Sequence, residues 1–293
     1  MKVAVFTNLY KNYSSKHFLS TIKKLRNKSI DVFIDEKSIE NMGQKKYSSF
    51  STHVGAFSKL DKSFDFVICI GGDGTILRAA SYINNLSIPI IGINTGRLGF
   101  LAKIKATKID GAINAIINKK YEISERTLVT ISSTTESGKI KKLGYALNEI
   151  SITRKNTTSL ITIETKLNDN YLNTYWADGL IIATPTGSTG YSLSCGGPII
   201  MPDSKNLVIT PIAPHNLNAR PLVIPDNTKV SIKISGRENE FFVSLDSKIT
   251  TLNNENIISI KKASHTIKMI ELEKENFLKT LRDKLFWGKD KRN

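Results

Sequence analysis

The sequence predicts a Rossmann-like α/β domain with a doubly wound parallel sheet, then a mostly antiparallel β-sandwich domain and a C-terminal helix. Apolar strand-like runs alternate with helical runs up to about residue 121, which is typical of a parallel sheet covered by helices. From about residue 122, strand-like segments are separated by polar turns. Between Lys274 and Phe286, apolar residues recur at helical spacing. We place the domains at 1–122, 123–272 and 273–293, with the last segment packing back on the body.

The N-terminal domain begins with a strand from Lys2 to Phe6 and a helix whose apolar side carries Phe18, Leu19, Ile22 and Leu25. A second strand is expected over 30–34, and residues 36–62 are ambiguous between loop and helix. The apolar runs 66–70 and 88–94 predict two more strands, each followed by a turn that contains glycine. Helices are expected over 76–83 and 107–119. Ligands of such sheets bind at the carboxyl ends of strands, where both turns lie.

The first of these turns, Gly71-Gly72-Asp73-Gly74-Thr75, is called the glycine turn below. Its three glycines allow unusual backbone angles and a close approach of a ligand to the main chain. The helix that follows directs free N–H groups and its positive dipole end at an anion, usually phosphate. Asp73 is an acid within an anion site, which suits a base or a magnesium partner. A helix-capping aspartate in a tight turn is the structural alternative.

In the second domain, strands are expected over 127–133, 141–153, 159–166, 171–176, 207–212, 229–235, 240–246 and 256–270. The segments Glu136–Lys139 and Asn168–Asn170 are hairpin signals. The strand series is interrupted by Ala177 to Pro198. Within it, the hydroxyl-rich block Thr184–Pro198 contains four glycines, two prolines and six Ser or Thr residues. Loops of this composition present N–H and hydroxyl groups to a ligand, although turn chemistry alone is an alternative.

Asn148 and Glu149 stand in an otherwise apolar strand context. A buried Asn-Glu pair needs hydrogen-bond partners. The Asn side chain offers a donor and an acceptor to a base edge, and the Glu side chain accepts from hydroxyls. The pair is therefore a candidate ligand contact, and a solvated strand face is the alternative.

Composition excludes several classes of protein. The 293 residues suffice for one large domain or two ordinary ones. The formal charge of +16 favours anionic partners, but the lysines are scattered along the chain, so we expect neither nucleic-acid nor membrane binding. Two cysteines, Cys69 and Cys195, form no disulfide framework. The four histidines lack metal-ligand spacing, so no metal site of the protein's own is expected.

The chain begins with a strand pattern and not with a signal peptide, and no apolar run approaches the ~20 residues of a membrane span. We expect a cytoplasmic protein.

Taken together, the ordered motifs resemble the NAD kinase family. They are GGDGT, NTGRLGF, the NE pair, ADGLIIATPTGSTGYSLSCGGPI and PHNLNARPLVI, and they span about residues 66–225. The GGDGT motif alone is weak, because lipid kinases and phosphofructokinases carry a similar turn. The long hydroxyl-rich motif is far more specific.

The resemblance implies transfer of the γ-phosphoryl group of ATP to the 2′-hydroxyl of the adenosine ribose of NAD, giving NADP. Asp73 resembles the catalytic base, and Gly72 and Gly74 let the nucleotide approach. Phe100 corresponds to a residue that lines the adenine pocket. Further correspondences are Asn148 to an adenine contact, Glu149 and Asp178 to acids that hold the nicotinamide-side ribose and carboxamide, and Thr189, Gly190, Tyr191 and Ser194 to dinucleotide contacts.

Two positions depart from the family pattern. The family often has alanine where Gly190 stands, so a side-chain role there is in doubt. The segment Leu245-Asp246-Ser247-Lys248 resembles an Asp-Gly-Gln or Asp-Ser-Gln turn, but Lys248 differs and no role is assigned to that turn. The resemblance also implies a homodimer or homotetramer whose substrate pockets are completed by a neighbouring subunit.

The residues themselves support this chemistry. A ribose hydroxyl is a weak nucleophile, so transfer needs in-line placement, cations on the phosphates and a proton acceptor. Asp73 is the only acid in a phosphate-binding turn and is the expected acceptor. Magnesium (Mg²⁺) is expected to arrive with ATP. Arg78 and Arg97 are candidates to contact phosphate, although a surface or structural role is the stronger expectation for each.

Two alternatives remain at this level. In lipid kinases such as diacylglycerol kinase, an Asn-Glu pair follows closely after GGDGT, whereas here it comes about 75 residues later. A non-enzymatic NAD(P)-binding or nucleic-acid-binding protein is the second alternative. The dinucleotide fingerprint G-x-G-x-x-G follows no strand of this sequence, and the retained Asp73 disfavours a mere sensor.

Overall fold

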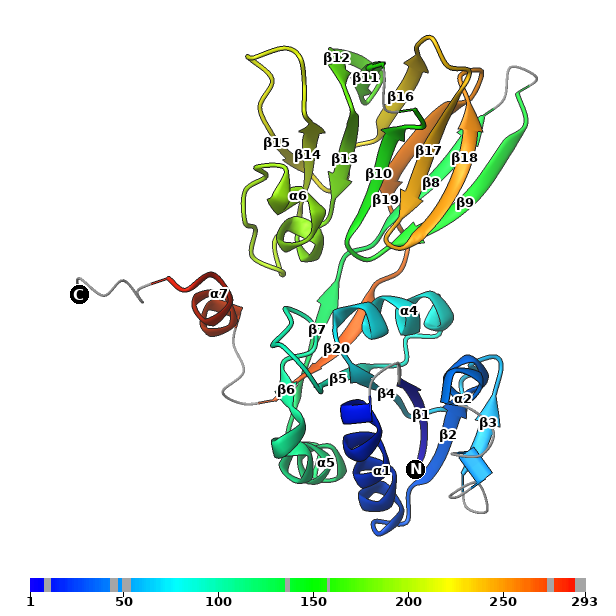
Figure 1. Ribbon diagram of the computed structural model, residues 1–293, viewed down its shortest axis with the longest axis vertical. Helices are drawn as coiled ribbons and strands as arrows, with labels where there is room; N and C mark the ends of the chain where they lie inside the picture. Colours follow the sequence, from blue (N-terminus) through cyan, green and yellow to red (C-terminus); the bar gives the residue numbers. More distant parts are fainter. Residues whose placement is uncertain are drawn as a thin grey trace. The chain divides into compact units, whose positions relative to one another are not determined.

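The structure, a computed structural model, describes residues 1–7, 12–42, 47–48, 54–134, 138–156, 159–272 and 277–287. The chain divides into two compact units. Unit 1 comprises Met1–Glu125 and Ile267–Asn293, and unit 2 comprises Arg126–Thr266. Each unit has its own sheets and is described by itself (Figure 1).

Unit 1 is built on an eight-stranded sheet with the order β3-β2-β1-β4-β5-β20-β7, and β6 pairs with β5. Its strands are β1 (Lys2–Thr7), β2 (Asp31–Asp35), β3 (Gly55–Phe57), β4 (Phe66–Gly71), β5 (Ile90–Asn94), β6 (Ile104–Lys105), β7 (Glu122–Arg126) and β20 (Ile267–Glu271). The strands from β3 to β20 in this order pair in parallel. From β1 the chain continues outward to β2 and β3, while β4 and β5 lie on the other side. The strand order therefore reverses between β1 and β4.

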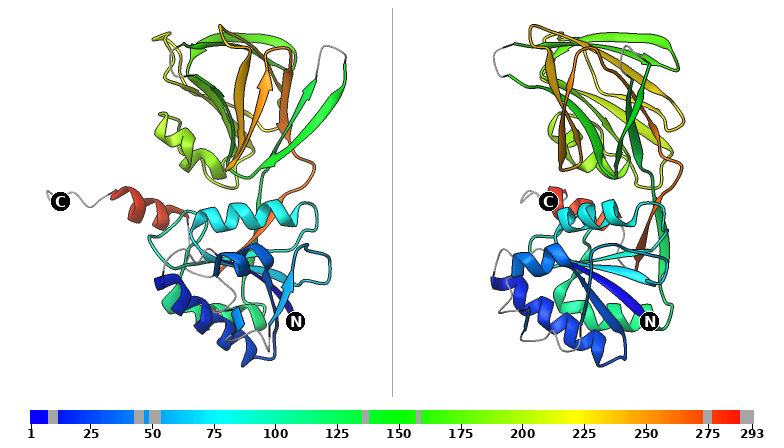
Figure 2. Two further views of the ribbon diagram at one scale, coloured as in Figure 1. Left: turned by 45° about the vertical axis from the view of Figure 1, so that its right-hand side comes forward. Right: turned by 90° about the vertical axis from the view of Figure 1, so that its right-hand side faces the viewer.

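Helices cover both faces of this sheet, as the predicted doubly wound fold requires. They are α1 (Asn12–Arg26), α2 (Glu36–Met42), α4 (Asp73–Ile83), α5 (Ile109–Ile117) and a 3₁₀ turn at Ala106–Lys108. The C-terminal helix α7 (Phe277–Leu285) also belongs to unit 1. Figure 2 shows α4 on one face and α1 with α5 on the other. Phe18 and Ile22 of α1 pack with Ile113 of α5 against the sheet, whose central strand β4 is buried along its whole length. A strand buried on both faces explains why Phe66–Ile70 reads as one apolar run.

Unit 2 is a β-sandwich of two six-stranded sheets whose strand pairs are antiparallel. One sheet has the order β15-β14-β13-β10-β17-β18, and the other has the order β12-β11-β16-β19-β8-β9. The strands are β8 (Val129–Thr134), β9 (Ile140–Ala146), β10 (Glu149–Arg154), β11 (Ile161–Leu167), β12 (Asn170–Ala177), β13 (Gly179–Ala183), β14 (Asn206–Ile212), β15 (Leu222–Pro225), β16 (Val230–Ser235), β17 (Glu240–Leu245), β18 (Lys248–Asn253) and β19 (Ile257–Lys262). A shared apolar core fills the space between the sheets.

The Asn168–Asn170 hairpin signal is confirmed, since Asn168 and Asp169 take positive φ between β11 and β12. The other hairpin signal lies partly outside the described residues. The run 256–270 was expected to be one strand of the β domain, and this is wrong. It splits into β19 in the sandwich and β20, which pairs in parallel with β5 of unit 1. β7, which begins at Glu122, also belongs to the sheet of unit 1. An apolar strand pattern does not specify which sheet the strand joins.

The expected strand 141–153 is also two strands. β9 ends at Ala146 in one sheet of the sandwich, and β10 starts at Glu149 in the other sheet. The segment Leu147-Asn148 is therefore a corner at which the chain crosses between the sheets. No helix in the described part of the chain is both long enough and apolar enough to cross a membrane.

Candidate active site

The glycine turn joins the end of β4 to the start of α4 at the carboxyl edge of the sheet in unit 1. A side chain on Gly71 would overlap the hydroxyl of Thr75, so only glycine fits there. Gly72 and Gly74 are exposed, and a Cβ built at either position meets nothing within 4 Å. The start of α4 is therefore open to a ligand at both glycines, as an anion site at a helix N-terminus requires.

Asp73 is the first residue of α4, and its carboxylate is held by the loop that follows β5. Its Oδ1 atom accepts hydrogen bonds from the backbone N–H groups of Leu101 (3.1 Å) and Ala102 (2.9 Å), and its Oδ2 atom accepts one from Phe100 (2.8 Å). A carboxylate has about four lone-pair sites, so Oδ2 keeps the capacity to accept another hydrogen bond. The three donors fix the orientation of the Asp73 carboxylate.

The loop that holds Asp73 is ordered by Asn94, which sequence reasoning did not single out. The Asn94 side-chain amide donates to the carbonyls of Arg97 (2.8 Å) and Ala102 (3.2 Å), and its oxygen accepts from the N–H of Gly96 (2.8 Å). Asn94 is only 5% exposed. Its type and its place at the end of a buried strand were visible in the sequence as a turn signal, but its partners were not.

Phe100 lies in the same loop and contacts the C-terminal helix. Its ring centroid is 6.1 Å from that of Phe277, and the Lys284 ammonium lies 5.4 Å from the Phe100 centroid. Helix α7 therefore packs on the loop that carries the Asp73 donors, and both belong to unit 1.

Arg78 and Arg97 differ in their surroundings. Arg97 is exposed in the turn after β5. The Arg78 guanidinium instead pairs with the buried carboxylate of Asp35 at 3.2 Å and donates to Ser38 Oγ and the Thr7 carbonyl. The charge of Arg78 is thus already balanced within the fold.

In unit 2, the corner at Asn148 and Glu149 is held by Asp246, in the turn between β17 and β18. Asp246 Oδ2 accepts from the Leu147 N–H (2.9 Å), and Oδ1 accepts from the N–H groups of Asn148 (2.8 Å) and Glu149 (3.2 Å). The Asp246 N–H donates back to the Glu149 carbonyl at 3.1 Å. Sequence reasoning assigned this turn no role, and only the tertiary structure reveals its contact with the Asn-Glu pair.

The hydroxyl-rich block lies directly against the same corner. Thr184 accepts from the Gly187 N–H and donates to the Leu147 carbonyl, at 3.1 and 2.6 Å. A side chain on Gly187 would overlap the Asn148 carbonyl, so this glycine is required by close approach. A Cβ on Gly190 would lie 2.8 Å from Glu149 Oε2. Glycine at this position leaves room for the Glu149 carboxyl, which would have to shift if alanine were present.

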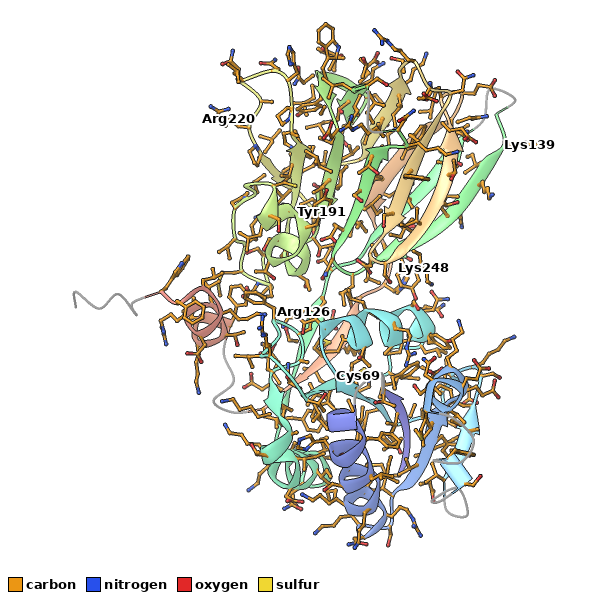
Figure 3. The ribbon with its side chains drawn as sticks, viewed as in Figure 1. Cys69, Arg126, Lys139, Tyr191, Arg220 and Lys248 are labelled. Atoms are coloured by element: carbon orange, nitrogen blue, oxygen red, sulfur yellow. The ribbon has the colours of Figure 1, made fainter. Side chains whose placement is uncertain are left out.

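Several hydroxyls of the block have structural partners. Ser188 bonds to the carbonyls of Pro185 and Ile200, and Ser192 bonds to Thr210. Thr189 donates to the Thr186 carbonyl at 3.3 Å. Tyr191 and Ser194, at the two ends of the short helix α6 (Tyr191–Ser194), are exposed, and Tyr191 is labelled in Figure 3. The block is therefore partly a folding element, with a smaller set of side chains free to meet a ligand.

Three buried polar atoms in this region have no hydrogen-bond partner among the described residues. They are Asn148 Oδ1, Glu149 Oε2 and Thr186 Oγ1. Leaving such atoms unpaired costs ~1–3 kcal/mol each. Their grouping around one corner indicates a site where a ligand supplies the missing donors.

The electrostatics of the corner are unusual. Burial, together with the negative charge of Asp246, raises the pKa of Glu149 to about 7, although a hydrogen bond from the Tyr191 N–H opposes the shift. Burial also raises the pKa of Tyr191, with added contributions from Cys195, Asp178 and Glu149. A carboxyl with a pKa near 7 gains or loses its proton near neutral pH, and its charged form is the better acceptor for the hydroxyl groups of a ligand.

Asp178 is at the opposite end of the paired strands β10 and β13 from Glu149, because Glu149 pairs with Ala183 and Thr153 pairs with Gly179. The Asp178 carboxylate forms an ion pair with Arg154 at 2.9 Å. Both acids are still close enough to act on the Tyr191 hydroxyl. The structure thus brings Asn148, Glu149, Gly190 and Tyr191 together and leaves Asp178 at the margin.

We expect Glu149→Gln to stabilise the protein above neutral pH. The raised pKa means that between about pH 4.5 and 7 the folded state binds more protons than the unfolded state, so stability falls as pH rises through this window. Glutamine cannot ionise, and it should raise the free energy of unfolding by about 1–3 kcal/mol at pH 8 but change it little at pH 4. Urea titrations at both pH values measure this, and an equal change at both would contradict it.

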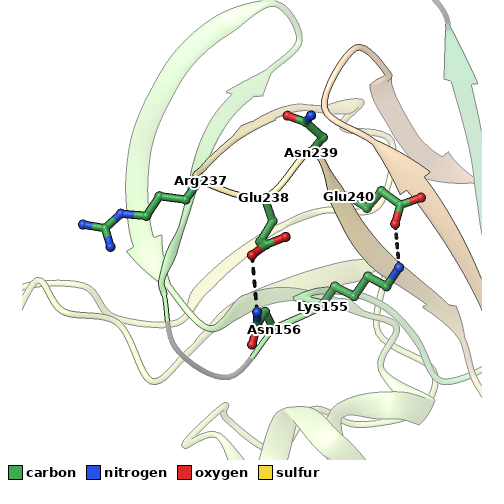
Figure 4. A pocket seen from close by; sticks show the side chains of 6 residues that line it. All are labelled: Lys155, Asn156, Arg237, Glu238, Asn239 and Glu240. Carbon is green, nitrogen blue, oxygen red and sulfur yellow. Dashed lines mark hydrogen bonds and ion pairs between the residues drawn. The ribbon is translucent and has the colours of Figure 1, made fainter.

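A separate surface cavity of about 540 Å³ lies at the end of the sandwich, between Lys155-Asn156 and Arg237–Glu240 (Figure 4). Its side chains pair with one another, Lys155 with Glu240 and Asn156 with Glu238. No residue singled out in the sequence lines it. Among the described residues, no three His, Cys, Asp or Glu side chains gather as metal ligands would.

Both halves of the chain match a known family. Residues 3–121 match the model of the ATP-NAD kinase N-terminal domain, and residues 147–272 match that of the ATP-NAD kinase C-terminal domain. The chain is 54% identical over 298 residues to the NAD kinase of Flavobacterium psychrophilum, and 50% identical to that of Flavobacterium johnsoniae. Each match covers 100% of both chains.

Solved structures share the fold. Yeast NADH kinase complexed with NADH superposes with a TM-score of 0.86 at 23% identity, covering 99% of this chain and 89% of that one. An NAD kinase from Archaeoglobus fulgidus in complex with ATP gives 0.75 at 24% identity, covering 96% of this chain and 99% of that one. This similarity confirms the expected arrangement of an α/β unit followed by a β-sandwich.

Proposed function

This chain belongs to the NAD kinase family, and from that premise we propose which residues carry its reaction, the transfer of the γ-phosphoryl group of ATP to the adenosine-ribose 2′-hydroxyl of NAD. Asp73 accepts the proton of that hydroxyl as the hydroxyl oxygen attacks the γ-phosphorus, and the bond from the γ-phosphorus to the bridging oxygen breaks to release ADP. The proposal is supported chiefly by the held carboxylate of Asp73, which is oriented by three backbone donors and keeps acceptor capacity on Oδ2.

The phosphates of ATP bind at the carboxyl ends of β1 and β4. Nucleotides bind to open α/β sheets where the strand order reverses, and in unit 1 this is between β1 and β4. The free N–H groups at the start of α4 face this edge, and Gly72 and Gly74 leave their surroundings open. Magnesium bound with ATP would neutralise part of the phosphate charge, and it would be held by phosphate oxygens and water with one or two carboxylates at most.

We expect Gly74→Ala to fold normally and to bind ATP more weakly. The added methyl meets no protein atom within 4 Å and no strained backbone angle, so the fold should tolerate it. If phosphate approaches the main chain here, the methyl occupies part of that space and should raise the KM for ATP about tenfold. Steady-state kinetics together with a melting curve measure this. An unchanged KM for ATP would exclude close approach at Gly74.

NAD is bound by the corner and the hydroxyl-rich block of unit 2. Asn148 contacts the adenine, and Glu149 accepts hydrogen bonds from ribose hydroxyls. Their unpartnered oxygens support this assignment. Asp178, Thr189, Gly190, Tyr191 and Ser194 complete the dinucleotide contacts of this unit.

Arg97 is the better phosphate candidate of the two arginines, because it is exposed in the turn beside the Asp73 loop. Arg78 balances Asp35, and we assign it to the stability of unit 1. Family membership also resolves the two alternatives, a lipid kinase and a non-enzymatic binding protein, in favour of an NAD kinase enzyme.

The enzyme acts as a homodimer or homotetramer. Exposed apolar side chains on unit 2 support this: Trp176 on the edge strand β12 is 57% exposed, and Leu217 in the adjoining loop is 86% exposed. The His215 N–H, which donates to the Trp176 carbonyl at 2.7 Å, holds that loop against β12. Analytical ultracentrifugation measures the assembly, and a monomer at micromolar concentration would refute it.

The proposed function is tested by NADP formation from NAD, with ATP, other nucleoside triphosphates and polyphosphate compared as donors and NADH compared as acceptor. We expect magnesium-dependent turnover with NAD and ATP. Turnover that is unaffected by chelation of the metal, or by loss of the Asp73 carboxylate, would contradict the proposed roles.

A further inference from the structure

We propose that Asp246 is a positioning residue for NAD, which holds Asn148 and Glu149 in their binding conformation. This inference rests on the proposed contact of Asn148 and Glu149 with the dinucleotide. It assigns a role to a turn in which the sequence shows only a partial family pattern.

The first support is geometric. Both oxygens of the Asp246 carboxylate are used, and together they accept the backbone N–H groups of Leu147, Asn148 and Glu149. These three residues form the corner between the two sheets, and no strand ladder satisfies all of their donors. A carboxylate that binds three successive N–H groups fixes the backbone, and therefore the directions in which the Asn148 and Glu149 side chains leave it.

The second support is that Asp246 is itself held in place. It has φ of +50°, which Asp and Asn adopt more readily than most residues. Its N–H donates to the Glu149 carbonyl at 3.1 Å, and its carbonyl accepts from the Ser244 hydroxyl at 3.1 Å. The β17–β18 turn and the corner therefore each donate hydrogen bonds to the other, and a shift of one should displace the other.

The third support is electrostatic. Asp246 and the N–H of Tyr191 act on the Glu149 carboxyl, and Lys248 acts on Asp246. Glu149 in turn raises the pKa of the Tyr191 hydroxyl and of the Cys195 thiol. Burial raises the pKa of Glu149 most, and the charge of Asp246 raises it further. Asp246 thus keeps Glu149 close to the point at which it gains or loses its proton.

The main test is Asp246→Asn, which keeps the shape and the tolerance of positive φ but removes the charge. An amide has one acceptor oxygen, so at least one of the three N–H groups would face an NH₂ group. The KM for NAD should rise about tenfold, while kcat at saturating NAD should stay within about threefold of the wild type. In the pH profile of kcat/KM for NAD, the limb that reflects Glu149 should be absent in Glu149→Gln. In Asp246→Asn this limb should move to lower pH.

A second variant, Asp246→Glu, separates charge from position. It keeps the negative charge but extends the carboxylate by one methylene, so it cannot accept all three N–H groups without a shift of the corner. The KM for NAD should rise here too, while the pH limb should stay closer to that of the wild type. Asp226→Asn is the matched control, because Asp226 is a buried carboxylate of unit 2 that pairs with Lys262. It should lower the melting temperature without changing the KM for NAD.

The outcomes distinguish this inference from the proposed function. If Asn148→Ala and Glu149→Gln leave the KM for NAD unchanged, the proposed binding site is wrong. If they raise it while both Asp246 variants bind NAD like the wild type, the inference about Asp246 is overturned. Failure of both Asp246 variants to fold would also overturn it, because Asp246 would then act on the whole unit and not on the corner.

Discussion

Asp73→Asn is expected to bind NAD normally and to lose about 10²- to 10⁴-fold in kcat, which is the usual contribution of a general base. Asparagine matches aspartate in shape but cannot accept the proton of the ribose hydroxyl at neutral pH. The loss should therefore appear in the chemical step, with little change in the dissociation constant of NAD measured by calorimetry.

Asp73→Asn is also expected to lower the stability of the protein, so its folding must be checked. The Asp73 carboxylate accepts three backbone N–H groups, and an amide must turn its NH₂ group toward at least one of them. The variant should thus also lose about 1–3 kcal/mol of stability. Asp110→Asn is a suitable control, because Asp110 is an exposed acid of the same unit that pairs with Lys24. Wild-type turnover in a folded Asp73→Asn enzyme would show that Asp73 is not the general base.

Gly99→Ala is expected to reduce kcat by about 10²-fold, although residue 99 has no side chain to contribute chemistry. A Cβ at this position would overlap Asp73 Oδ1 and would lie 2.9 Å from Oδ2. Either the carboxylate or the loop must move, and a displacement of about 1 Å is enough to misplace a base relative to its substrate.

Gly96→Ala is the matched control for this prediction. Gly96 is in the same turn and takes no positive φ, and a methyl group on its Cα would meet nothing within 4 Å. We expect Gly96→Ala to retain most of the kcat. Equal kcat values for the two variants, measured at saturating NAD and ATP, would show that the orientation of Asp73 does not depend on Gly99.

Much of the fold is visible in the sequence because its signals are local. Strand β4 is apolar along its length because both of its faces are buried, and the glycine turn follows it directly. The same locality makes Asp73 a candidate, since an acid within a strand–glycine–helix turn is recognisable without a partner. Asn148, Glu149 and the hydroxyl-rich block are likewise recognisable from composition in an unusual context.

The sheet that each strand joins could not be predicted from these local signals. β20 has an apolar pattern like that of the strands before it, yet it pairs with β5 from the other end of the chain. The Asn-Glu pair was expected inside one strand, but it marks a corner between two sheets. Periodicity reports which side of a strand is buried and does not report which strand lies beside it.

The sequence by itself determined the local features of the candidate site: a glycine turn with one acid, an Asn-Glu pair and a block of small hydroxylated residues, in that order. Only the tertiary structure decided which groups hold them. Asp246 is about 100 residues from the corner that it binds, Phe100 to Ala102 supply the donors of Asp73, and Asp35 neutralises Arg78. These contacts have one physical reason in common. A buried charge or N–H group needs a partner, but any part of the chain that the fold brings near can supply it.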